Sequence, residues 1–133
     1  MVKSSEILII DNDQNITNAL EKILEDEGYS IATANTGKKA KKILRQENPQ
    51  VIILDIRLPD IHGTAMISYL KQNNSKTKII VLSGDTSYTT INTAIAHGAD
   101  DYLIKPVEFT MLNKAIQTQL KTTTHTNLTT FKE

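Results

Sequence analysis

The sequence predicts a doubly wound α/β domain, in which five parallel strands form one sheet with helices on both faces. Five short aliphatic runs alternate along the chain with five stretches whose apolar residues recur at helical spacing. The composition agrees, because 39% of the 133 residues are hydrophobic, only 5% are aromatic and none is cysteine. An aliphatic core of this kind suits strands that are buried on both faces, and a chain of this length forms one domain.

The first part of the chain predicts two strands and two helices. Residues 7–10 form a continuous apolar run that predicts a buried strand, and residues 30–34 are a weaker candidate. Gly28 is placed to end the helix between them, while Thr36 can cap a second helix that Pro49 stops. The inner faces of the two helices are Ile16, Leu20, Ile23 and Leu24 in the first, and Ala40, Ile43 and Leu44 in the second.

The second part continues the alternation with three more strands and three more helices. We expect the strands at residues 51–54, 79–82 and 101–104, the last being a weaker candidate. We expect the helices at residues 64–72, 88–97 and 108–120. Gly98 ends the fourth helix, and Pro106 breaks the last strand. Right-handed crossovers then wind the chain into a parallel sheet covered on both sides.

The last twelve residues, 122–133, include six threonines and have no periodic apolar face. We therefore expect a domain over residues 1–121, followed by a poorly ordered tail or the start of a linker.

The charge balance excludes several classes of partner. Fifteen basic residues match fifteen acidic ones, and the sequence pI is near 6.8, so we expect no direct nucleic-acid binding by this segment. The apolar run at 7–10 is too short for a signal-peptide core or a membrane span, which predicts a cytoplasmic protein with no membrane contact. A lysine cluster in the second helix is interpreted as a solvated face. It consists of Lys38, Lys39, Lys41 and Lys42.

Polar residues follow four of the predicted strands directly, where an open parallel sheet binds its ligands. They are Asp11, Asn12 and Asp13 after the first strand, Asp55 after the third, Ser83 after the fourth and Lys105 after the fifth. Asp13 is also well placed to cap the first helix. The sheet would thus bring acids, a hydroxyl and an amine to one edge.

This set of groups points to phosphoryl transfer. Two carboxylates within about 4 Å repel each other by on the order of 4 kcal/mol at an effective dielectric constant near 20, so a cation is expected between them. Oxygen ligands favour Mg²⁺, which also keeps phosphate oxygens in its shell. Lys105 can pair with a phosphoryl oxygen, and the Ser83 hydroxyl can donate to the same group. We predict Mg²⁺-dependent phosphoryl transfer onto a carboxylate.

Two other motifs overlap the first acidic cluster. A calcium loop starting at Asp11 would need Gly at its sixth position and Glu at its twelfth, but Ile16 and Lys22 stand there. The run ILIIDND at residues 7–13 also resembles the nucleophile motif of haloacid-dehalogenase-type phosphatases, with Leu82-Ser83-Gly84 resembling their second motif. That family would make Asp11 the nucleophile, and it leaves Asp55 and Lys105 unexplained.

A resemblance that covers residues 6–120 accounts for all of these groups. The chain resembles the response-regulator receiver domains of bacterial two-component signalling, which have the flavodoxin-like fold predicted above. The matching segments are ILIIDND at 7–13, VIILDIRLPD at 51–60, IVLSG at 80–84 and GADDYLIKP at 98–106. Their spacing also fits, with 44 residues from Asp11 to Asp55, 28 more to Ser83 and 22 more to Lys105.

The resemblance implies roles for the site residues. Asp55 would accept a phosphoryl group from a phosphohistidine of a sensor histidine kinase or phosphotransfer protein, or from a small acyl phosphate. Mg²⁺ would be held by Asp11, Asp55 and the backbone carbonyl of Arg57, with Asn12 where the family usually has a second acid. Lys105 would pair with the phosphoryl oxygens, and the bond from Lys105 to Pro106 would be cis.

The resemblance also implies a switch. The phosphoryl group would draw in Ser83 and let Tyr102 turn inward, although Tyr102 could instead be a static tyrosine at the rim of the site. The face of the fourth helix, fifth strand and fifth helix would carry the change to an unknown output domain or target, or form a homodimer. Arg57 and Asp85 lie where the family tunes the lifetime of its phosphoryl group. Such a domain is not a stand-alone enzyme, although it assists its own phosphorylation and dephosphorylation.

Asn12 departs from the family pattern, because an amide brings no charge where an acid is expected. Metal affinity should fall, with partial compensation from Asp13, and we expect phosphorylation to survive but to need more Mg²⁺. Two alternatives stay open: a receiver-like module that is no longer phosphorylated, and a small Mg²⁺-dependent phosphatase with Asp11 as nucleophile.

Overall fold

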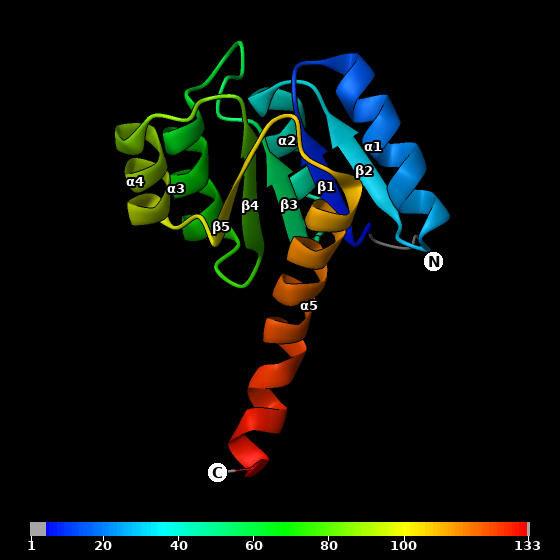
Figure 1. The fold of residues 1–133 in the computed structure, drawn as a ribbon. Coiled ribbons are helices and arrows are strands. Elements are labelled where there is room, and N and C mark those ends of the chain that lie inside the picture. The colour runs from blue at the N-terminus through cyan, green and yellow to red at the C-terminus, as the bar shows by residue number, and fades with distance from the viewer. Residues whose placement is uncertain (1–4, 133) are drawn as a thin grey trace.

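The computed structural model describes residues 5–132, with side chains described up to residue 121. Strands and helices alternate along the described chain, as predicted. The elements are β1 (Ile7–Ile10), α1 (Gln14–Asp26), β2 (Ile31–Ala34), α2 (Gly37–Leu44), β3 (Val51–Leu54), α3 (Gly63–Asn73), β4 (Lys78–Ser83), α4 (Tyr88–His97), β5 (Asp101–Ile104) and α5 (Phe109–Lys132). All strand pairs are parallel, in the order β2-β1-β3-β4-β5 (Figure 1), which confirms the predicted doubly wound fold.

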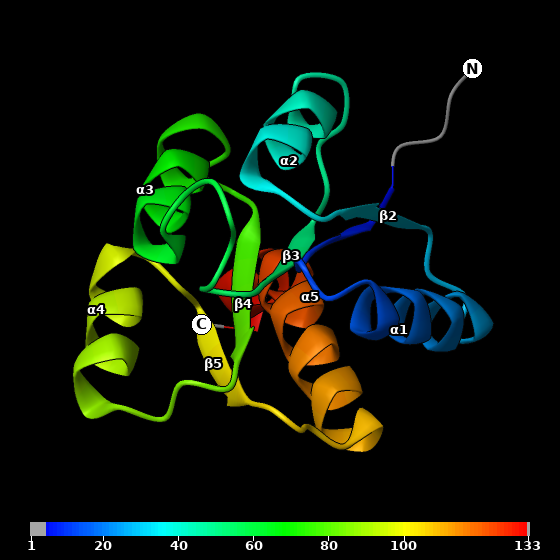
Figure 2. The ribbon, with the colours of Figure 1, turned by 90° about the horizontal axis from the view of Figure 1, so that it is seen from above.

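The helices form a layer on each face of the sheet. Figure 2 shows α1 and α5 on one side, with α2, α3 and α4 on the other. Successive residues of β1 point to opposite layers, because Leu8 and Ile10 belong to the cluster under α2, α3 and α4, whereas Ile7 and Ile9 belong to the cluster under α1 and α5. This double coverage explains why β1 and β3 are continuous apolar runs with every residue buried.

The helix boundaries near the sheet's carboxyl edge are set by capping residues. The Asp13 side chain accepts hydrogen bonds from the backbone N–H groups of Asn15 and Ile16, at 3.0 and 3.3 Å, and so caps α1. The Thr36 side chain accepts from the backbone N–H of Lys39 at 3.0 Å and caps α2. Both caps agree with the sequence prediction, and they fix where each helix starts relative to the strand before it.

The fifth helix is longer than predicted. It was expected to end near Leu120, but the backbone stays helical to Lys132, and Figure 1 shows its end running beyond the other elements. Threonine is only a moderately poor helix former, and the segment contains no Gly or Pro that would stop the helix. The use of residues 122–133 as a tail or linker stays a prediction, since their side chains lie outside the described part.

Candidate functional site

The four polar positions predicted from the sequence meet at the carboxyl edge of the sheet. Ile10 is aligned with Leu54 in the parallel pair of β1 and β3, so Asp11 and Asp55 follow side by side, and the Asp55 N–H donates to the Ile10 carbonyl at 2.9 Å. Ser83 ends β4, and its carbonyl accepts from the Lys105 N–H at 2.9 Å. The short central strands therefore bring together groups that lie far apart in the chain.

Lys105 joins the two carboxylates. Its Nζ lies 2.8 Å from Asp11 Oδ2 and 3.1 Å from Asp55 Oδ2, and the peptide bond that follows, to Pro106, is cis. The Asp11 side chain is only 4% exposed and that of Asp55 13%, whereas Asn12 beside them is exposed. The amine thus provides the positive charge that two buried carboxylates on adjacent strands require.

Burial and neighbouring charges shift the pKa values in this cluster. Burial raises the pKa of Asp11 above its ordinary value, and the Asp55 charge adds to this, although hydrogen bonds from Lys105 and from the Asp13 N–H oppose it. Burial alone would lower the pKa of Lys105, but its hydrogen bond to Asp11 and the charges of both carboxylates outweigh burial and raise it. Lys105 is therefore held as a cation beside Asp55.

The oxygen donors at this edge fit a hard divalent ion. Two carboxylates converge here, and the Asp55 Oδ1 accepts from the Arg57 N–H at 3.1 Å, so the start of the loop after β3 lies next to Asp55. Asn35, directly after β2, has a buried side-chain oxygen with no hydrogen-bond partner, and the residue before it, Ala34, accepts from the Asp11 N–H.

The number of acids at this edge is nevertheless small. Among the side chains that the structure describes, no three His, Cys, Asp or Glu residues form a metal-binding group. An ion here would depend on two carboxylates together with the neutral oxygens of Asn12 and the Arg57 carbonyl. Asp13, expected to compensate for Asn12, has its Oδ1 engaged in capping α1. The donor set matches the preference of Mg²⁺ for a few carboxylates and several waters.

The hydroxyl of Ser83 is fully buried and connects the site to α4. Its Oγ accepts from the backbone N–H of Asp85 at 3.2 Å, and the hydroxyl also forms a hydrogen bond with the Tyr102 hydroxyl. The Asp85 carboxylate accepts from the Ser87 N–H at 2.8 Å and from the Thr90 hydroxyl at 2.9 Å, and these hydrogen bonds lower its pKa. Asp85 is thus fixed at the start of α4.

The hydroxyl of Tyr102 contacts the same loop. It donates to the Asp85 carbonyl at 2.7 Å, so the half-buried ring bridges β5 and the loop after β4, and burial raises its pKa. The sequence had placed Tyr102 near the site but gave no partner for its hydroxyl, because a backbone carbonyl has no sequence signature. The loop from Ser83 to Asp85 therefore has hydrogen bonds both to α4 and to β5.

Another contact that the sequence reasoning missed involves Asp60. Its carboxylate accepts from the backbone N–H groups of Gly37 and Lys38, at 2.8 and 2.9 Å. The sequence contained one signal for this contact. The first turn of α2 has two lysines and no acid, whereas a helix N-terminus favours a negative charge, so the charge has to come from another segment.

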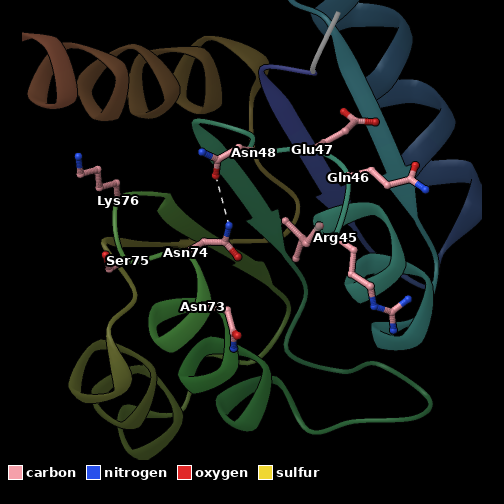
Figure 3. Close-up of a pocket in the computed structure, with 9 residues that line it drawn as sticks. Arg45, Gln46, Glu47, Asn48, Asn73, Asn74, Ser75 and Lys76 are labelled. Atoms are coloured by element: carbon pink, nitrogen blue, oxygen red, sulfur yellow. Dashed lines mark hydrogen bonds between the residues drawn. The ribbon is translucent and has the colours of Figure 1, made fainter. Parts of the chain in front are cut away.

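A polar hollow of about 520 Å³ at the opposite edge of the domain contains none of the predicted site residues. Figure 3 shows it between the end of α2 and the end of α3. Its lining includes four amide side chains, from Gln46, Asn48, Asn73 and Asn74, and three charged residues, Arg45, Glu47 and Lys76. Among the described side chains, no ion pair joins the charged residues of this hollow, unlike the edge that carries Asp55, so the candidate site remains at the carboxyl ends of the strands.

Known proteins share both the sequence and the fold. Residues 7–117 match the response regulator receiver domain. The transcriptional regulatory protein AfsQ1 of Streptomyces coelicolor is 33% identical over 115 residues, which cover 86% of this chain and 51% of AfsQ1. The chain thus spans about half the length of this relative, and 26% of ZraR from Escherichia coli.

Two solved structures show the same similarity in three dimensions. A CheY-like receiver domain protein from Methanospirillum hungatei superposes with a TM-score of 0.88 at 29% identity, over 92% of this chain and 98% of that one. A response regulator from Burkholderia pseudomallei, solved with a phosphorylated aspartic acid, a calcium ion and citrate, gives a TM-score of 0.81 at 28% identity, over 94% of this chain and 74% of that one.

These matches decide between the two families that the sequence resembled. The receiver match covers Asp55, Ser83 and Lys105 together, so the phosphatase interpretation with Asp11 as nucleophile is not supported. Within the described residues, no helix is long and apolar enough to cross a membrane. Receiver domains are signalling domains that work with a histidine kinase and are not stand-alone enzymes. The chain belongs to the response regulator receiver domain family and is a receiver domain of a two-component response regulator.

Proposed function

We propose that Asp55 is the residue that accepts the phosphoryl group, with Asp11, Lys105 and Ser83 assisting. The observation that carries this assignment is the position of Lys105 Nζ between the carboxylates of Asp11 and Asp55. This position gives Asp55 two useful neighbours: the Asp11 carboxylate, which can share a metal ion with it, and the Lys105 amine, which can pair with a phosphoryl oxygen. The response regulator from Burkholderia pseudomallei, which carries a phosphorylated aspartic acid and a calcium ion, supports the proposal.

The reaction is a transfer between two nucleophiles. An Asp55 carboxylate oxygen forms a bond to phosphorus while the bond from phosphorus to the imidazole nitrogen of the donor breaks, and the electron pair leaves with the imidazole. Lys105, already held as a cation beside Asp55, pairs with a phosphoryl oxygen. Mg²⁺, held by Asp11, Asp55, Asn12 and the Arg57 carbonyl, would supply charge that stabilises the phosphoryl oxygens.

The buried hydroxyl of Ser83 transmits the modification. Its oxygen already accepts from the Asp85 N–H, and donation of its proton to a phosphoryl oxygen on Asp55 would replace its hydrogen bond with the Tyr102 hydroxyl. A shift of Ser83 toward Asp55 would pull on Asp85, whose carbonyl holds the Tyr102 hydroxyl and whose carboxylate holds α4. Arg57 and Asp85 lie beside this path, and we propose that they set the lifetime of the phosphoryl group.

A phosphohistidine donor has an apolar surface to dock on next to Lys105. A hollow of about 430 Å³ lies between α1 and the segment after β5, with more apolar than polar surface. It is lined by Ile16, Ala19, Leu20, Leu82, Lys105, Pro106 and Val107. We propose that the histidine kinase or phosphotransfer protein contacts this hollow, which brings its histidine to the edge that carries Asp55.

A second apolar surface is formed by α4, β5 and α5. Ile95 of α4, Ile104 of β5 and Met111 of α5 are 46%, 37% and 56% exposed, respectively. Exposed apolar residues on three neighbouring elements indicate a contact surface, and we propose that two copies associate through it. Sedimentation of the Ile95→Lys variant tests this, because dimer formation with beryllofluoride should be lost while Asp55 is still modified.

Labelling with acetyl phosphate and Mg²⁺ tests the assignment of Asp55. We expect the mass of the protein to rise by one phosphoryl group located on Asp55, no labelling in Asp55→Asn, and unchanged labelling in Asp26→Asn, which alters an exposed acid of α1. Absence of labelling in the wild-type protein would mean a receiver module that is no longer phosphorylated. Labelling on Asp11 would show that the nucleophile was assigned to the wrong strand.

A further inference from the structure

The loop that follows Asp55 is attached to the rest of the domain at two places. At its base, the Gly63 N–H donates to the Ile56 carbonyl at 2.9 Å, and Arg57 and His62 form an isolated antiparallel bridge. At its tip, the Asp60 carboxylate is bound to the start of α2. The tip attachment joins elements that are more than twenty residues apart in the chain, so it decides where the loop lies against its neighbour.

Asp60 binds α2 with both of its carboxylate oxygens. Oδ1 accepts from the Gly37 N–H at 2.8 Å and Oδ2 from the Lys38 N–H at 2.9 Å, and these two hydrogen bonds lower the pKa of Asp60. Because the Thr36 side chain accepts only from the Lys39 N–H, the Asp60 carboxylate completes the capping of this helix from another loop.

The sequence around both partners is adapted to this contact. The first turn of α2 contains Lys38 and Lys39 and no acid, although the positive end of a helix dipole disfavours cations. A carboxylate supplied from outside the helix compensates for this arrangement. Gly37 is needed for the close approach, because a Cβ at this position would collide with the side chain of Ile61, next to Asp60.

The same loop carries a group that orients the proposed phosphoryl acceptor. The Arg57 N–H donates to Asp55 Oδ1 at 3.1 Å, while Asp55 Oδ2 accepts from Lys105. The direction of the carboxylate therefore depends on where the loop holds Arg57. Without the Asp60 contact, the bridge to His62 is the tie described at the base of the loop for Arg57, and a displacement of Arg57 by about 1 Å is enough to slow a transfer reaction substantially.

We propose that Asp60 is a positioning residue for phosphoryl transfer, because it clamps the loop to α2 and thereby fixes the Arg57 N–H that orients Asp55. The inference rests on the proposed role of Asp55. It adds a residue outside the site, on the far side of the loop, whose carboxylate has no contact with the reacting groups.

Three variants test the inference. We expect Asp60→Ala to slow acetyl-phosphate labelling of Asp55 about tenfold and to raise the Mg²⁺ concentration at half-maximal labelling. Asp60→Asn should lie between Asp60→Ala and the wild type, since the amide oxygen can still accept one of the two N–H groups. The matched control is Thr36→Ala, which removes the cap that α2 supplies for itself and leaves the loop attached. It should lower the melting temperature but leave both labelling values unchanged.

The outcomes separate this inference from the assignment of Asp55. If the wild type is labelled on Asp55 and Asp60→Ala shows the same rate and Mg²⁺ dependence, positioning by Asp60 is wrong and the acceptor assignment stands. If Thr36→Ala slows labelling as much as Asp60→Ala does, the stability of α2 is responsible and the clamp is again refuted. If the wild type is not labelled at all, both proposals fail. Should Asp60→Ala not fold, Asp60→Asn gives the same comparison.

Discussion

The amine of Lys105 is expected to contribute strongly to the stability of the metal-free domain. Its distances of 2.8 and 3.1 Å to the two Oδ2 atoms limit the separation of these oxygens to about 6 Å. The Lys105 side chain is only 20% exposed, and those of Asp11 and Asp55 are less exposed still, so water screens this cluster weakly. At about 6 Å and an effective dielectric constant near 20, two carboxylates repel each other by about 3 kcal/mol. We therefore expect Lys105→Met to lower the free energy of unfolding by about 3 kcal/mol.

Urea unfolding in buffer with EDTA measures this change. The control is the double variant Lys105→Met with Asp55→Asn, which should recover most of the lost stability because only one charged carboxylate remains. Addition of Mg²⁺ should also recover stability in Lys105→Met, since an ion that binds only the folded domain stabilises it. Equal stability of Lys105→Met and wild type in EDTA would refute the electrostatic reasoning. So would a double variant that is no more stable than Lys105→Met.

Three further predictions concern single positions. Asn12→Asp should lower the Mg²⁺ concentration at half-maximal labelling of the protein by acetyl phosphate, and equal values in both forms would contradict the weakened metal site. Tyr102→Phe should lower the unfolding free energy by about 1 kcal/mol, because the Asp85 carbonyl loses its hydrogen bond, and urea unfolding would show no change if the hydroxyl were unimportant. Gly37→Ala should lower the free energy of unfolding by about 1–3 kcal/mol in the same assay, because the added methyl group collides with Ile61. An unchanged free energy would mean that the loop can move away from α2 without loss of stability.

The central strands could be predicted because they are buried on both faces, whereas the partly buried edge strands β2 and β5 were the weaker candidates. A run such as Ile7–Ile10 has no polar position, and this is typical of a strand inside a doubly covered parallel sheet. The helix ends next to Gly28 and Gly98 were also predictable, because both glycines adopt positive φ angles, of 101° and 122°, that other residues rarely adopt. The end of α5 was not, since nothing in the threonine-rich segment marks a stop.

The site was predictable to the extent that its residues directly follow strands. Asp11, Asp55 and Lys105 meet because parallel strands end at one edge, and this needs no knowledge of side-chain packing. The contacts of Asp60 and Tyr102 could not be predicted in this way. Their partners are backbone N–H and carbonyl groups of distant segments, which every residue has and which the sequence therefore does not distinguish.

The wide spacing of the groups around Lys105 has a consequence for the newly made chain. The amine and the Asp11 carboxylate are 94 positions apart, and β5, which precedes Lys105, pairs with β4 on the far side of β3. In a nascent chain on the ribosome, the proposed acceptor site is therefore incomplete until almost the whole domain has emerged and the last strand has added to the sheet. The geometry that the proposed acceptor needs is therefore absent from any chain that stops before β5 and Lys105.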